Sequence, residues 1–537
     1  MVLTRARDQF RPGVRSHLTA GRARGAAGRE ERTTSVDDGT TTRPGPTAGA
    51  GAPRLDLRSG TQRMFAHVLV NALLVSVVNY TLWFAVTFWV YLETRSVFAT
   101  GVIAGVFLVA TASTGIWFGS IVDHHRKQRV LQASAATSLA VYVVCLAGYL
   151  LTPAEVFRDP GSPRLWVFVV LLMLGVITGN LRTIALPTLV TLLVPERLRD
   201  RANGLVGTTS GVSFLVTSVI SGLLVAAGGM RYALLLAVVV LAGALVHLSR
   251  VHIPERRVVT TAAAEVGPAG VDPGDGIDVR GTLRLIRGVP GLVALIAFSC
   301  VNNSLGGTFM ALMDAYGLSL VSVQAWGLLW GALSAAMIVG GLAVARFGLG
   351  ANPVRTLLLV NVALWLGTAL FPLRSSIVLL AVGMTVFLFL MPFAEASEQT
   401  VLQRVVPYER QGRVFGFAQS VEQAASPLTA FLISPIAQFL VIPSMTDGAG
   451  ARAIGGWFGT GSDRGLALVF VVTALVGLLV TVLALASAPY RRLSAAYRTS
   501  APSAGGGDPA PAVEATVDGP GPDLPESVGP SPTRSSA

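Results

Sequence analysis

Long apolar runs alternate with short polar connections from about residue 65 to residue 488. A helix needs about 20 consecutive apolar residues to cross the hydrocarbon core of a bilayer, and each run is close to that length. The pattern therefore predicts an all-α polytopic membrane protein with twelve transmembrane helices, and an even number of spans places both termini on one side. The predicted spans are 65–91, 98–122, 129–151, 165–190, 203–227, 232–250, 290–313, 322–346, 355–373, 376–400, 413–442 and 465–488.

The longest internal connection, residues 251–289, divides these spans into two groups of six. We therefore predict an N-terminal six-helix half over 63–250 and a C-terminal six-helix half over 290–490. The segments 1–62 and 491–537 are rich in Gly, Ala, Ser and Pro and have little apolar clustering. Such segments cannot bury enough apolar surface to offset the entropy of ordering, so we predict disordered tails.

A short repeat supports two pseudo-symmetric halves. The pattern P-x5-R-x-x-G occurs twice, and each member of the second copy follows its counterpart by 212 residues. Both copies lie at the joint between the fourth and fifth span of a half, and membrane transporters built from such repeats place their substrate path at the interface of the halves. The repeat residues are Pro195, Arg201 and Gly204, and then Pro407, Arg413 and Gly416.

Composition excludes a soluble domain and several kinds of chemistry. Only 13% of the residues are charged and 52% are hydrophobic, with a mean hydropathy of +0.62. Cys145 and Cys300 both lie inside apolar runs, so we expect neither a disulfide nor a metal site. The sequence has no G-x-x-x-x-G-K-[ST], H-E-x-x-H or G-x-S-x-G pattern. We therefore expect no enzyme activity, no cofactor and no use of ATP as the energy source. Acids inside the predicted spans, considered below, suggest a proton gradient as the energy source instead.

The distribution of basic residues predicts the orientation. The connections after spans two, four, six, eight and ten, together with the span ends that flank them, contain 17 Lys and Arg residues, against seven for the other connections. Because basic loops are retained in the cytoplasm, we predict that both tails and the 251–289 connection are cytoplasmic and that the protein lies in the plasma membrane. The net charge of +12 then reflects these loops and not nucleic-acid binding. Within the middle connection, Arg280, Arg284 and Arg287 predict a short basic amphipathic element on the membrane surface.

The connection between spans two and three contains the most specific pattern, Gly119-Ser-Ile-Val-Asp123-His-His-Arg126-Lys127-Gln-Arg129. It resembles the signature loop of the major facilitator superfamily, G-x-x-x-D-[RK]-x-[GR]-[RK]-[RK], except that histidines stand at 124 and 125. The positive-inside rule alone explains the three cations, but it does not explain Gly119 and Asp123. The equivalent turn of the second half has Ala345 where the acid would be.

Within that superfamily, the joints resemble the macrolide and enterobactin exporters, which are drug:proton antiporters. The residues that carry this resemblance are Pro195-Glu196-Arg197, Arg201-Ala202-Asn203-Gly204, Tyr408 to Arg413, and Asp463-Arg464-Gly465-Leu466. The resemblance implies that Asp123 belongs to a charge relay at the cytoplasmic gate, with Arg126 and the start of span eleven near Gly412 as partners. It also implies export of amphipathic molecules such as drugs, antibiotics or siderophore-like metabolites.

Four ionisable residues lie inside predicted spans, where a charge is costly and suggests a function. Arg182 in span four and the pair Glu395 and Glu398 in span ten lie at similar depth, so we hypothesise an ion pair between Arg182 and one of the glutamates. The alternative is that all three reach to the membrane interface. Glu422 in span eleven is a candidate for proton coupling, and the alternative is a structural hydrogen bond to Gln419 or Gln423.

The family resemblance also implies that spans one and seven line the substrate cavity. Its candidate contacts are Asn79, Tyr80, Trp83, Asn302 and Asn303. The alternative is that the amides join helices to one another, as polar residues in membrane helices often do.

The sequence thus predicts a secondary transporter that exports amphipathic small molecules by alternating access. We expect small-molecule substrates, protons and the lipid bilayer as partners, no nucleic acid, and a monomer. One alternative is an uptake permease for a small metabolite. Another is a membrane scaffold or receptor that transports nothing and whose tails recruit partners.

Overall fold

The computed structural model describes residues 55–58, 60–94, 97–253 and 279–500. Within these ranges the ordered elements are all helices. Most of the predicted tails and residues 254–278 of the middle connection lie outside the described residues, so the predictions made for them stay predictions.

The described residues of the N-terminal half form eight helices and one short turn of helix. Its fourth span is broken at Asn180 into two helices, and the second of them contains Pro187. Proline has no backbone N–H, so one helical hydrogen bond is missing in this second helix. The elements are α1 (Gly60–Thr94), α2 (Val97–His124), α3 (Lys127–Leu151), α4 (Ala154–Arg158), α5 (Pro163–Gly179), α6 (Leu181–Leu193), η1 (Glu196–Leu198), α7 (Arg199–Gly228) and α8 (Met230–Arg250).

The C-terminal half begins with a surface helix and ends with another. Its fifth span continues through a π-helical turn, η5, into α16. The elements are α10 (Val279–Gly288), α11 (Leu292–Leu320), α12 (Val323–Phe347), α13 (Pro353–Leu370), η3 (Phe371–Leu373), α14 (Ile377–Val405), η4 (Tyr408–Arg410), α15 (Gln411–Ile436), η5 (Ala437–Val441), α16 (Ile442–Thr446), α17 (Ala449–Phe458), α18 (Ser462–Ala486) and α19 (Ala488–Thr499).

Every predicted span coincides with helix. Eleven helical segments among the described residues are long and apolar enough to cross a membrane, and α2 occupies the remaining predicted span, 98–122. The predicted all-α polytopic fold is therefore confirmed. The predicted C-terminal boundary at 491 falls inside α19, where Leu493 and Ser494 are buried. Helix α10 covers the predicted basic element and exposes Arg280, Arg284 and Arg287.

Several helices of the C-terminal half begin at a polar cap. The side chains of Ser322, Asn352, Ser376 and Ser487 each accept a hydrogen bond from a backbone N–H three residues later. These bonds satisfy first-turn amides that have no partner within the helix. Caps of this kind explain where helices begin within a chain that is apolar for most of its length.

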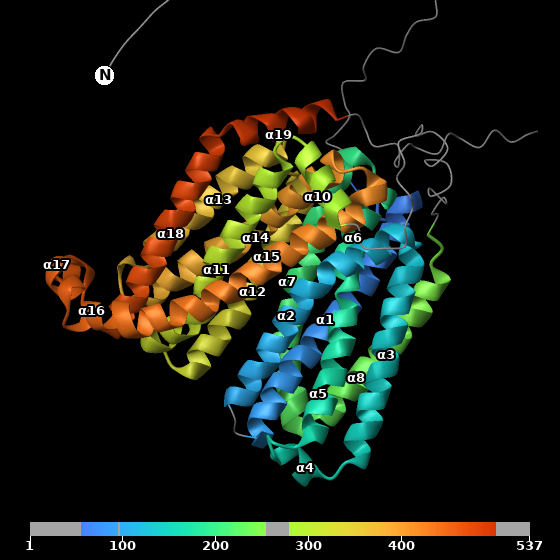
Figure 1. Ribbon diagram of the computed structural model, residues 1–537, viewed down its shortest axis with the longest axis horizontal. Helices are drawn as coiled ribbons and strands as arrows, with labels where there is room; N and C mark the ends of the chain where they lie inside the picture. The colour runs from blue at the N-terminus through green and yellow to red at the C-terminus, as the bar shows by residue number, and fades with distance from the viewer. Residues whose placement is uncertain (1–54, 59, 95–96, 254–278, 501–537) are drawn as a thin grey trace, which may run out of the picture. The chain divides into compact units, whose positions relative to one another are not determined.

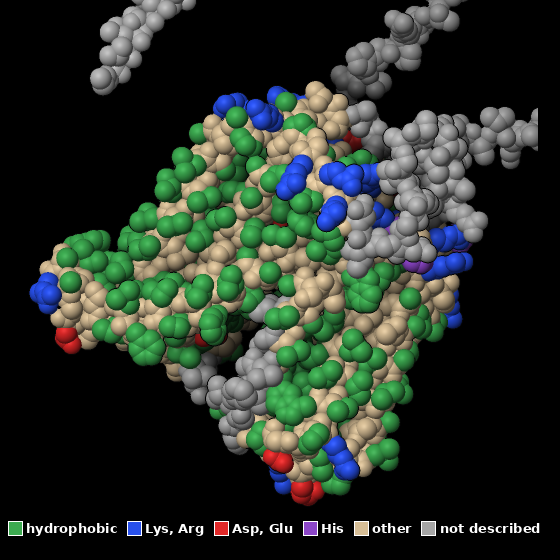
Figure 2. Space-filling model, viewed as in Figure 1, with side chains coloured by type: hydrophobic (Ala, Val, Ile, Leu, Met, Phe, Trp, Pro, Cys, Tyr) green, Lys and Arg blue, Asp and Glu red, His purple; other side chains and the backbone are tan. Residues whose placement is uncertain are grey.

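The helices have two different ends. Helices α10 and α19 lie at one end, and α4, α16 and α17 lie at the other (Figure 1). Lys and Arg side chains gather at the end with α10 and α19, whereas apolar side chains cover the sides of the helices (Figure 2). We call the end that carries α10, α19 and the connections after α2, α6 and α12 the basic end.

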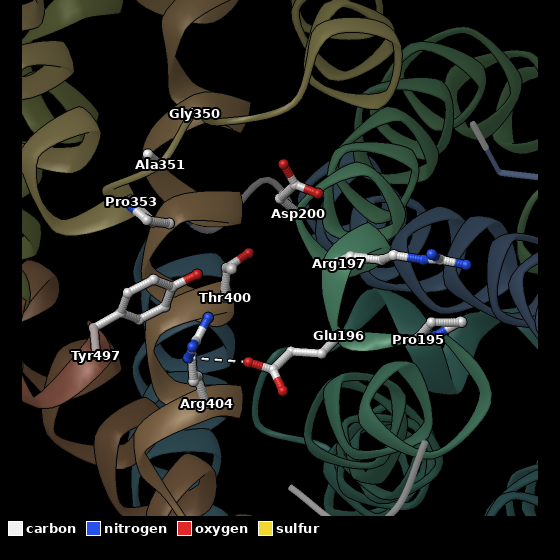
Figure 3. A pocket seen from close by; sticks show the side chains of 10 residues that line it. All are labelled: Pro195, Glu196, Arg197, Asp200, Gly350, Ala351, Pro353, Thr400, Arg404 and Tyr497. Carbon is white, nitrogen blue, oxygen red and sulfur yellow. Dashed lines mark ion pairs between the residues drawn. The ribbon is translucent and has the colours of Figure 1, made fainter. Parts of the chain in front are cut away.

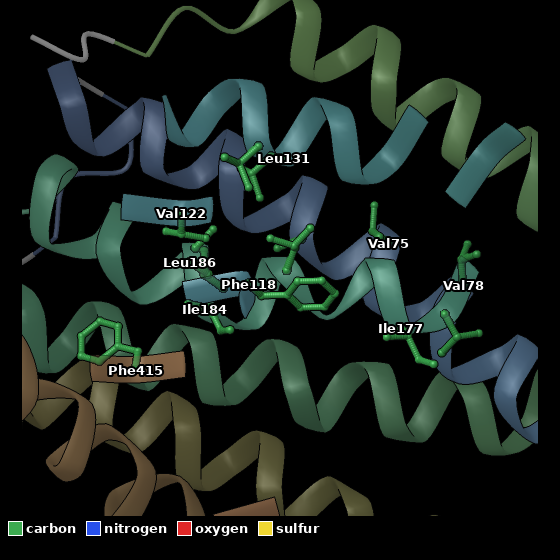
Figure 4. Packing of buried hydrophobic residues seen from close by; sticks show 14 of the residues in the cluster. Val75, Val78, Phe118, Val122, Leu131, Ile177, Ile184, Leu186 and Phe415 are labelled. Carbon is green, nitrogen blue, oxygen red and sulfur yellow. The ribbon is translucent and has the colours of Figure 1, made fainter. Parts of the chain in front are cut away.

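Two pairs of helices form the most extensive contacts between the halves, and α7 also packs against α14. Helix α2 packs against α15, and α7 packs against α12. The apolar core continues across the first pair, where Phe415 of α15 belongs to the same buried cluster as Val122 of α2 and Leu186 of α6 (Figure 4). These two interfaces position the candidate site.

Candidate functional site

Asp123 caps the beginning of α15 from the other half of the molecule. Its Oδ1 accepts a hydrogen bond from Gly412 N at 2.7 Å, and its Oδ2 accepts one from Arg413 N at 2.9 Å. The first amides of a helix have no partner within that helix, and its positive dipole end favours a carboxylate. Asp123, whose side chain is 3% exposed, thereby ties α2 to α15 at the basic end.

Glycines bring the backbones of α2 and α15 together. A Cβ at Gly119 would collide with the backbone oxygen of Gly412, and a Cβ at Gly416 would collide with the backbone oxygen of Gly115. Small residues allow this closeness between membrane helices. Without it, Asp123 could not reach the amides at the start of α15.

Arg413 and His124 complete this contact. The Arg413 guanidinium lies 3.8 Å from Asp123 Oδ2 and donates to His124 Nε2 at 2.8 Å. The Nδ1 of His124 lies 2.8 Å from the backbone oxygen of Ser120, so a neutral ring with its proton on Nδ1 satisfies both partners. The histidine that departs from the family pattern therefore lies in the interface itself.

The remaining residues of the predicted gate motif differ in their environment. Lys127 is buried, with its ammonium 5.0 Å from the ring centre of Tyr408, whereas Arg126 and Arg129 are exposed. The resemblance implied Arg126 as the partner of Asp123, but the described ion pair is formed by Arg413. The correction follows from geometry, since Arg413 lies on the same first turn of α15 as the amides that bind Asp123.

The α7–α12 interface repeats the close approach of glycines. A Cβ at Gly204 would lie 2.6 Å from Ala345 N, and one at Gly341 would lie 2.6 Å from Thr208 N. Asp200, at the start of α7, accepts a hydrogen bond from Leu349 N at 3.0 Å through Oδ2. Sequence reasoning missed Asp200, although it stands at the repeat offset from Gly412.

Behind both interfaces lies a buried polar network that sequence reasoning also missed. Arg199 is only 1% exposed and donates to the backbone oxygen of Thr191 at 3.0 Å. Asn203 and Gln403 exchange hydrogen bonds of 2.9 and 3.2 Å, and Gln411 donates to Gln403 O at 3.0 Å. Arg199 and Gln411 stand at the repeat offset, which is the signal that could have identified them. The network links the fourth and fifth spans of both halves next to the repeat residues.

Three acids gather in the membrane part of the C-terminal half. Ser299 of α11 donates to Glu398 Oε1 at 2.7 Å, and the carboxyl group of Glu398 interacts electrostatically with that of Glu422 of α15. The predicted alternative partners of Glu422 were Gln419 and Gln423. In the structure Gln419 instead donates to Thr183 of α6 at 2.9 Å, across the two halves.

Glu395 lies one helical turn before Glu398 and has a different environment. Its side chain is exposed although it stands well inside the 29-residue helix α14. It interacts electrostatically with Tyr80 of α1, whose side chain is 47% exposed. The two residues belong to opposite halves, so they face the space between the halves.

The hypothesised ion pair of Arg182 is not formed among the described residues. Arg182 is buried in the N-terminal half, where it donates to Asn71 Oδ1 at 2.7 Å and to Leu131 O at 3.0 Å. Both partners lie on the helices that surround α6, namely α1 and α3. Similar depth along two helices was therefore not enough to predict an ion pair, because the side chain of Arg182 is directed into its own half.

Two of the predicted substrate contacts join helices. Asn79 accepts from Tyr142 at 3.3 Å, and Asn302 accepts from Trp365 at 2.9 Å. Asn303 instead donates within α11 to the backbone oxygen of Ser299 at 3.1 Å. The contacts of Asn79 and Asn302 agree with the alternative interpretation of the amides. The Trp83 ring packs on Phe84 and Phe107, which leaves Trp83 and the exposed Tyr80 as the aromatic candidates.

The acids in the membrane part of the C-terminal half can bind protons, and the contacts of Asp123 and Asp200 can hold the basic end closed. Within the described ranges, no group of three or more His, Cys, Asp or Glu side chains converges as a metal site.

Comparison with known proteins places the fold. Three solved structures superpose along their whole or nearly whole length at low identity. A bacterial homologue of the iron transporter ferroportin, in an outward-facing state, has a TM-score of 0.56 at 14% identity and covers 79% of this chain and 100% of that chain. The human organic anion transporter MFSD10 (TETRAN) has a TM-score of 0.50 at 15% identity, with 79% and 100% covered. The proton:xylose symporter XylE has a TM-score of 0.57 at 12% identity, with 82% and 100% covered.

At these identities the likeness shows the fold alone and does not select a branch or a substrate. No curated protein matches the chain in sequence. The family model of the Major Facilitator Superfamily matches residues 68–430, which is more than half of the 537 residues. The chain therefore belongs to the major facilitator superfamily and is a multi-pass secondary transporter, not an enzyme.

Proposed function

We propose that this transporter exports amphipathic small molecules in exchange for protons, by alternating access of a site between its two halves. The observation that carries the proposal is that the carboxyl groups of Glu398 and Glu422 interact with each other inside the C-terminal half. Two carboxylates offer only acceptors, so such a pair is favourable only when the two groups share a proton. Ionisable residues inside a membrane are costly unless they serve a function.

The position of the pair supports a coupling role. Glu398 faces α11 and α15, whereas Glu395, three residues earlier on α14, faces the space between the halves. Loss of the shared proton would leave two carboxylates in contact, which repel each other strongly in a low-dielectric site. A charge change at Glu398 is therefore felt one helical turn away, where a substrate would contact Glu395.

Aromatic side chains support an amphipathic substrate. Phe214 of α7 lies between Phe84 of α1 and Trp330 of α12, with ring centres 6.5 and 6.3 Å apart respectively. Together with Tyr80 and Trp83, these rings provide apolar surface beside a carboxylate. A site of mostly apolar surface with a few polar groups suits molecules that combine an apolar body with a polar group.

We assign the basic end to the cytoplasm of the cell and the protein to the plasma membrane, because basic loops are retained on the cytoplasmic side. Both termini are then cytoplasmic, and the Asp123 and Asp200 contacts close the cytoplasmic end. The direction of transport is supported by the resemblance of the two joints to the exporter branch. Arg126 and Arg129, which are exposed, would act only as surface cations on the cytoplasmic side.

Efflux of a lipophilic fluorescent cation from cells that express the chain tests this proposal. We expect a protonophore to stop export by the parent chain and by the control variant Glu409→Gln, whose side chain is exposed in η4. Glu422→Gln and Glu398→Gln should reduce export about tenfold or more, the loss expected from removal of an essential proton-transfer group. Export that is indifferent to the protonophore would contradict proton coupling, and accumulation of the dye would favour an uptake permease.

A second measurement separates lost coupling from lost folding. In proteoliposomes without a gradient, Glu422→Gln should still exchange labelled for unlabelled dye, because exchange requires no net movement of protons. If exchange fails together with efflux, Glu422 serves the fold or the binding of substrate, and the assignment of the coupling pair is wrong.

A further inference from the structure

A cavity of about 540 Å³ at the basic end is lined by residues from both halves and from α19 (Figure 3). Glu196 and Asp200 belong to the N-terminal half, and Thr400 and Arg404 belong to α14. Tyr497 of α19 forms another part of the wall. Because opposite halves form its walls, the cavity can exist in this form only while the basic end is closed.

An ion pair crosses this cavity between the halves. Arg404 Nε lies 3.0 Å from Glu196 Oε1, and both side chains are at least three-quarters buried, with 25% and 19% exposure. Figure 3 shows the two side chains directed toward each other from α14 and from the joint between α6 and α7. Partial burial shields the pair from solvent and makes it stronger than a pair on the surface.

Helix α19 holds the arginine of this pair. The Arg404 guanidinium carbon lies 4.5 Å from the ring centre of Tyr497, and Nη2 donates to Ser500 O at 3.5 Å. A guanidinium over an aromatic face is attracted by the ring quadrupole. Burial raises the pKa of the Tyr497 phenol, which keeps the ring uncharged. The end of α19 therefore orients Arg404 toward the N-terminal half.

The other part of α19 is fixed to the C-terminal half. Its first turn is capped by Ser487, and its buried Leu493 lies against Gly291. Asn352, before α13, donates to Ser494 Oγ at 3.5 Å. One part of the helix is thus anchored on its own half, and its end contacts a pair that belongs to both halves.

We propose that α19 is a strap that stabilises the closed state of the basic end through the chain of contacts Tyr497, Arg404 and Glu196. Opening of the basic end separates Glu196 from Arg404, and the strap opposes that step. The device is one-sided. The repeat offset places Leu192 in the position that Arg404 occupies in the second half, so the first half has no equivalent cation.

Distance measurement between spin labels tests the strap without reference to transport. Labels at Ser249 and Arg355, exposed positions at the basic end of opposite halves, report its opening once Cys145 and Cys300 are replaced. We expect Tyr497→Ala and Arg404→Gln to raise the population with long distances about fivefold, as for loss of one partly buried charged contact. Tyr497→Phe keeps the ring but loses the interaction of the phenol with Arg404, so we expect a smaller rise than in Tyr497→Ala.

Two further variants make the outcome decisive. Arg498→Gln removes an exposed cation from the same helix beside Tyr497 and should have no effect. Glu196→Gln leaves α19 intact and should open the basic end to the same extent as Tyr497→Ala. In the double variant Glu196→Gln/Tyr497→Ala the population should rise no further, because the two residues act through one arginine.

Unchanged distances in Tyr497→Ala, Arg404→Gln and Glu196→Gln would overturn the proposal. Full additivity in the double variant would also overturn it, because α19 would then act independently of the ion pair. Neither result depends on whether the substrate is exported or coupled to protons.

Discussion

The α2–α15 and α7–α12 interfaces each join the halves through a carboxylate. The carboxylate lies on the second span of the N-terminal half at one interface and on the fifth span at the other. At α2–α15, Asp123 lies in the last turn of α2 and binds amides at the start of α15. At α7–α12, Asp200 stands at the start of α7 and binds the amide of Leu349, which follows α12. In each case one carboxylate from one half accepts from the backbone of the other, beside glycines that let the helices approach.

The repeat shows how the roles have been exchanged. Ala345 stands where the second half would have a counterpart of Asp123, and Asp200 is the counterpart of Gly412, whose amide Asp123 binds. The contact between a carboxylate and the backbone is therefore present at both interfaces, but the position of the residue that provides the carboxylate differs. A search of the two halves for the motif of Asp123 therefore finds an acid at one interface only.

The two contacts should differ in strength. Asp123 binds two amides at the positive end of a 26-residue helix and has Arg413 nearby. Asp200 binds one amide across the interface, in a turn that follows Gly348 with φ of 76°. Because a helix N-terminus favours a negative charge, we expect the α2–α15 contact to contribute more to closure of the basic end.

The largest effect should come from widening the α2–α15 interface. In Gly119→Val the side chain meets the backbone of Gly412, which cannot move without moving α15. We expect the transport rate to fall about a hundredfold, which is the effect of displacing the groups of a working site by about 1 Å. We also expect the distance between labels at Ser249 and Arg355 to remain long, because the basic end cannot close.

Gly243→Val is the matched control, since a Cβ at Gly243 of α8 has no atom within 4 Å. A transport rate for Gly119→Val equal to that of this control would show that backbone contact at α2–α15 is not required.

A smaller effect should separate the two acids. Asp123→Asn keeps one acceptor but removes the charge and presents an N–H group to one of the α15 amides. We expect it to destabilise the closed state by about 1–2 kcal/mol, from lost capping and dipole stabilisation, which is about fivefold to thirtyfold in population. Asp200→Asn should cost about half as much, because one inter-half hydrogen bond is affected.

The double variant Ala345→Asp/Asp200→Gly sharpens this comparison by giving the second interface the residues of the first. It should recover part of the closure lost in Asp200→Gly alone, in the same distance measurement. No recovery would indicate that the two interfaces differ in geometry and not only in the position of the acid.

The smallest effect should come from His124. In His124→Phe the Arg413 guanidinium loses an acceptor at an exposed position, and we expect about a twofold shift in the closed population, as for one exposed hydrogen bond. His124→Gln can restore the acceptor. The control is His125→Phe, because the described contact of the His125 ring is Nδ1 with Ile121 O at 3.1 Å in its own turn. Equal shifts in both phenylalanine variants would assign the effect to added apolar bulk.

The resemblance to a known loop drew attention to Asp123 and the start of α15, which lie in contact in the structure, but the sequence could not assign the cation. Arg126 is three residues from Asp123 in the chain, whereas Arg413 is brought to it by helix packing. The same reason applies to Arg182 and Glu422. Their depth in the membrane could be read from position along a helix, but their partners Asn71 and Glu398 depend on how the helices are rotated.

The sequence alone was enough to predict that the described part of the chain is helical and, approximately, where its membrane-spanning segments lie. Those properties follow from local apolar content and from the thickness of a bilayer, both of which are properties of consecutive residues. Helix α19 and the break at Asn180 were not foreseen, because short polar helices and interrupted spans have weak local signals.

Which polar groups meet depends on how the helices pack against one another. Spans that are apolar on most sides do not reveal which face is turned inward, and the periodicity that orients a helix in a soluble protein is weak here. The partners of Asp123, Glu398 and Arg404 lie on helices far away in the chain, and each is fixed by how closely two helices approach and at what rotation. Their identity is a property of packing, and no stretch of consecutive residues contains it.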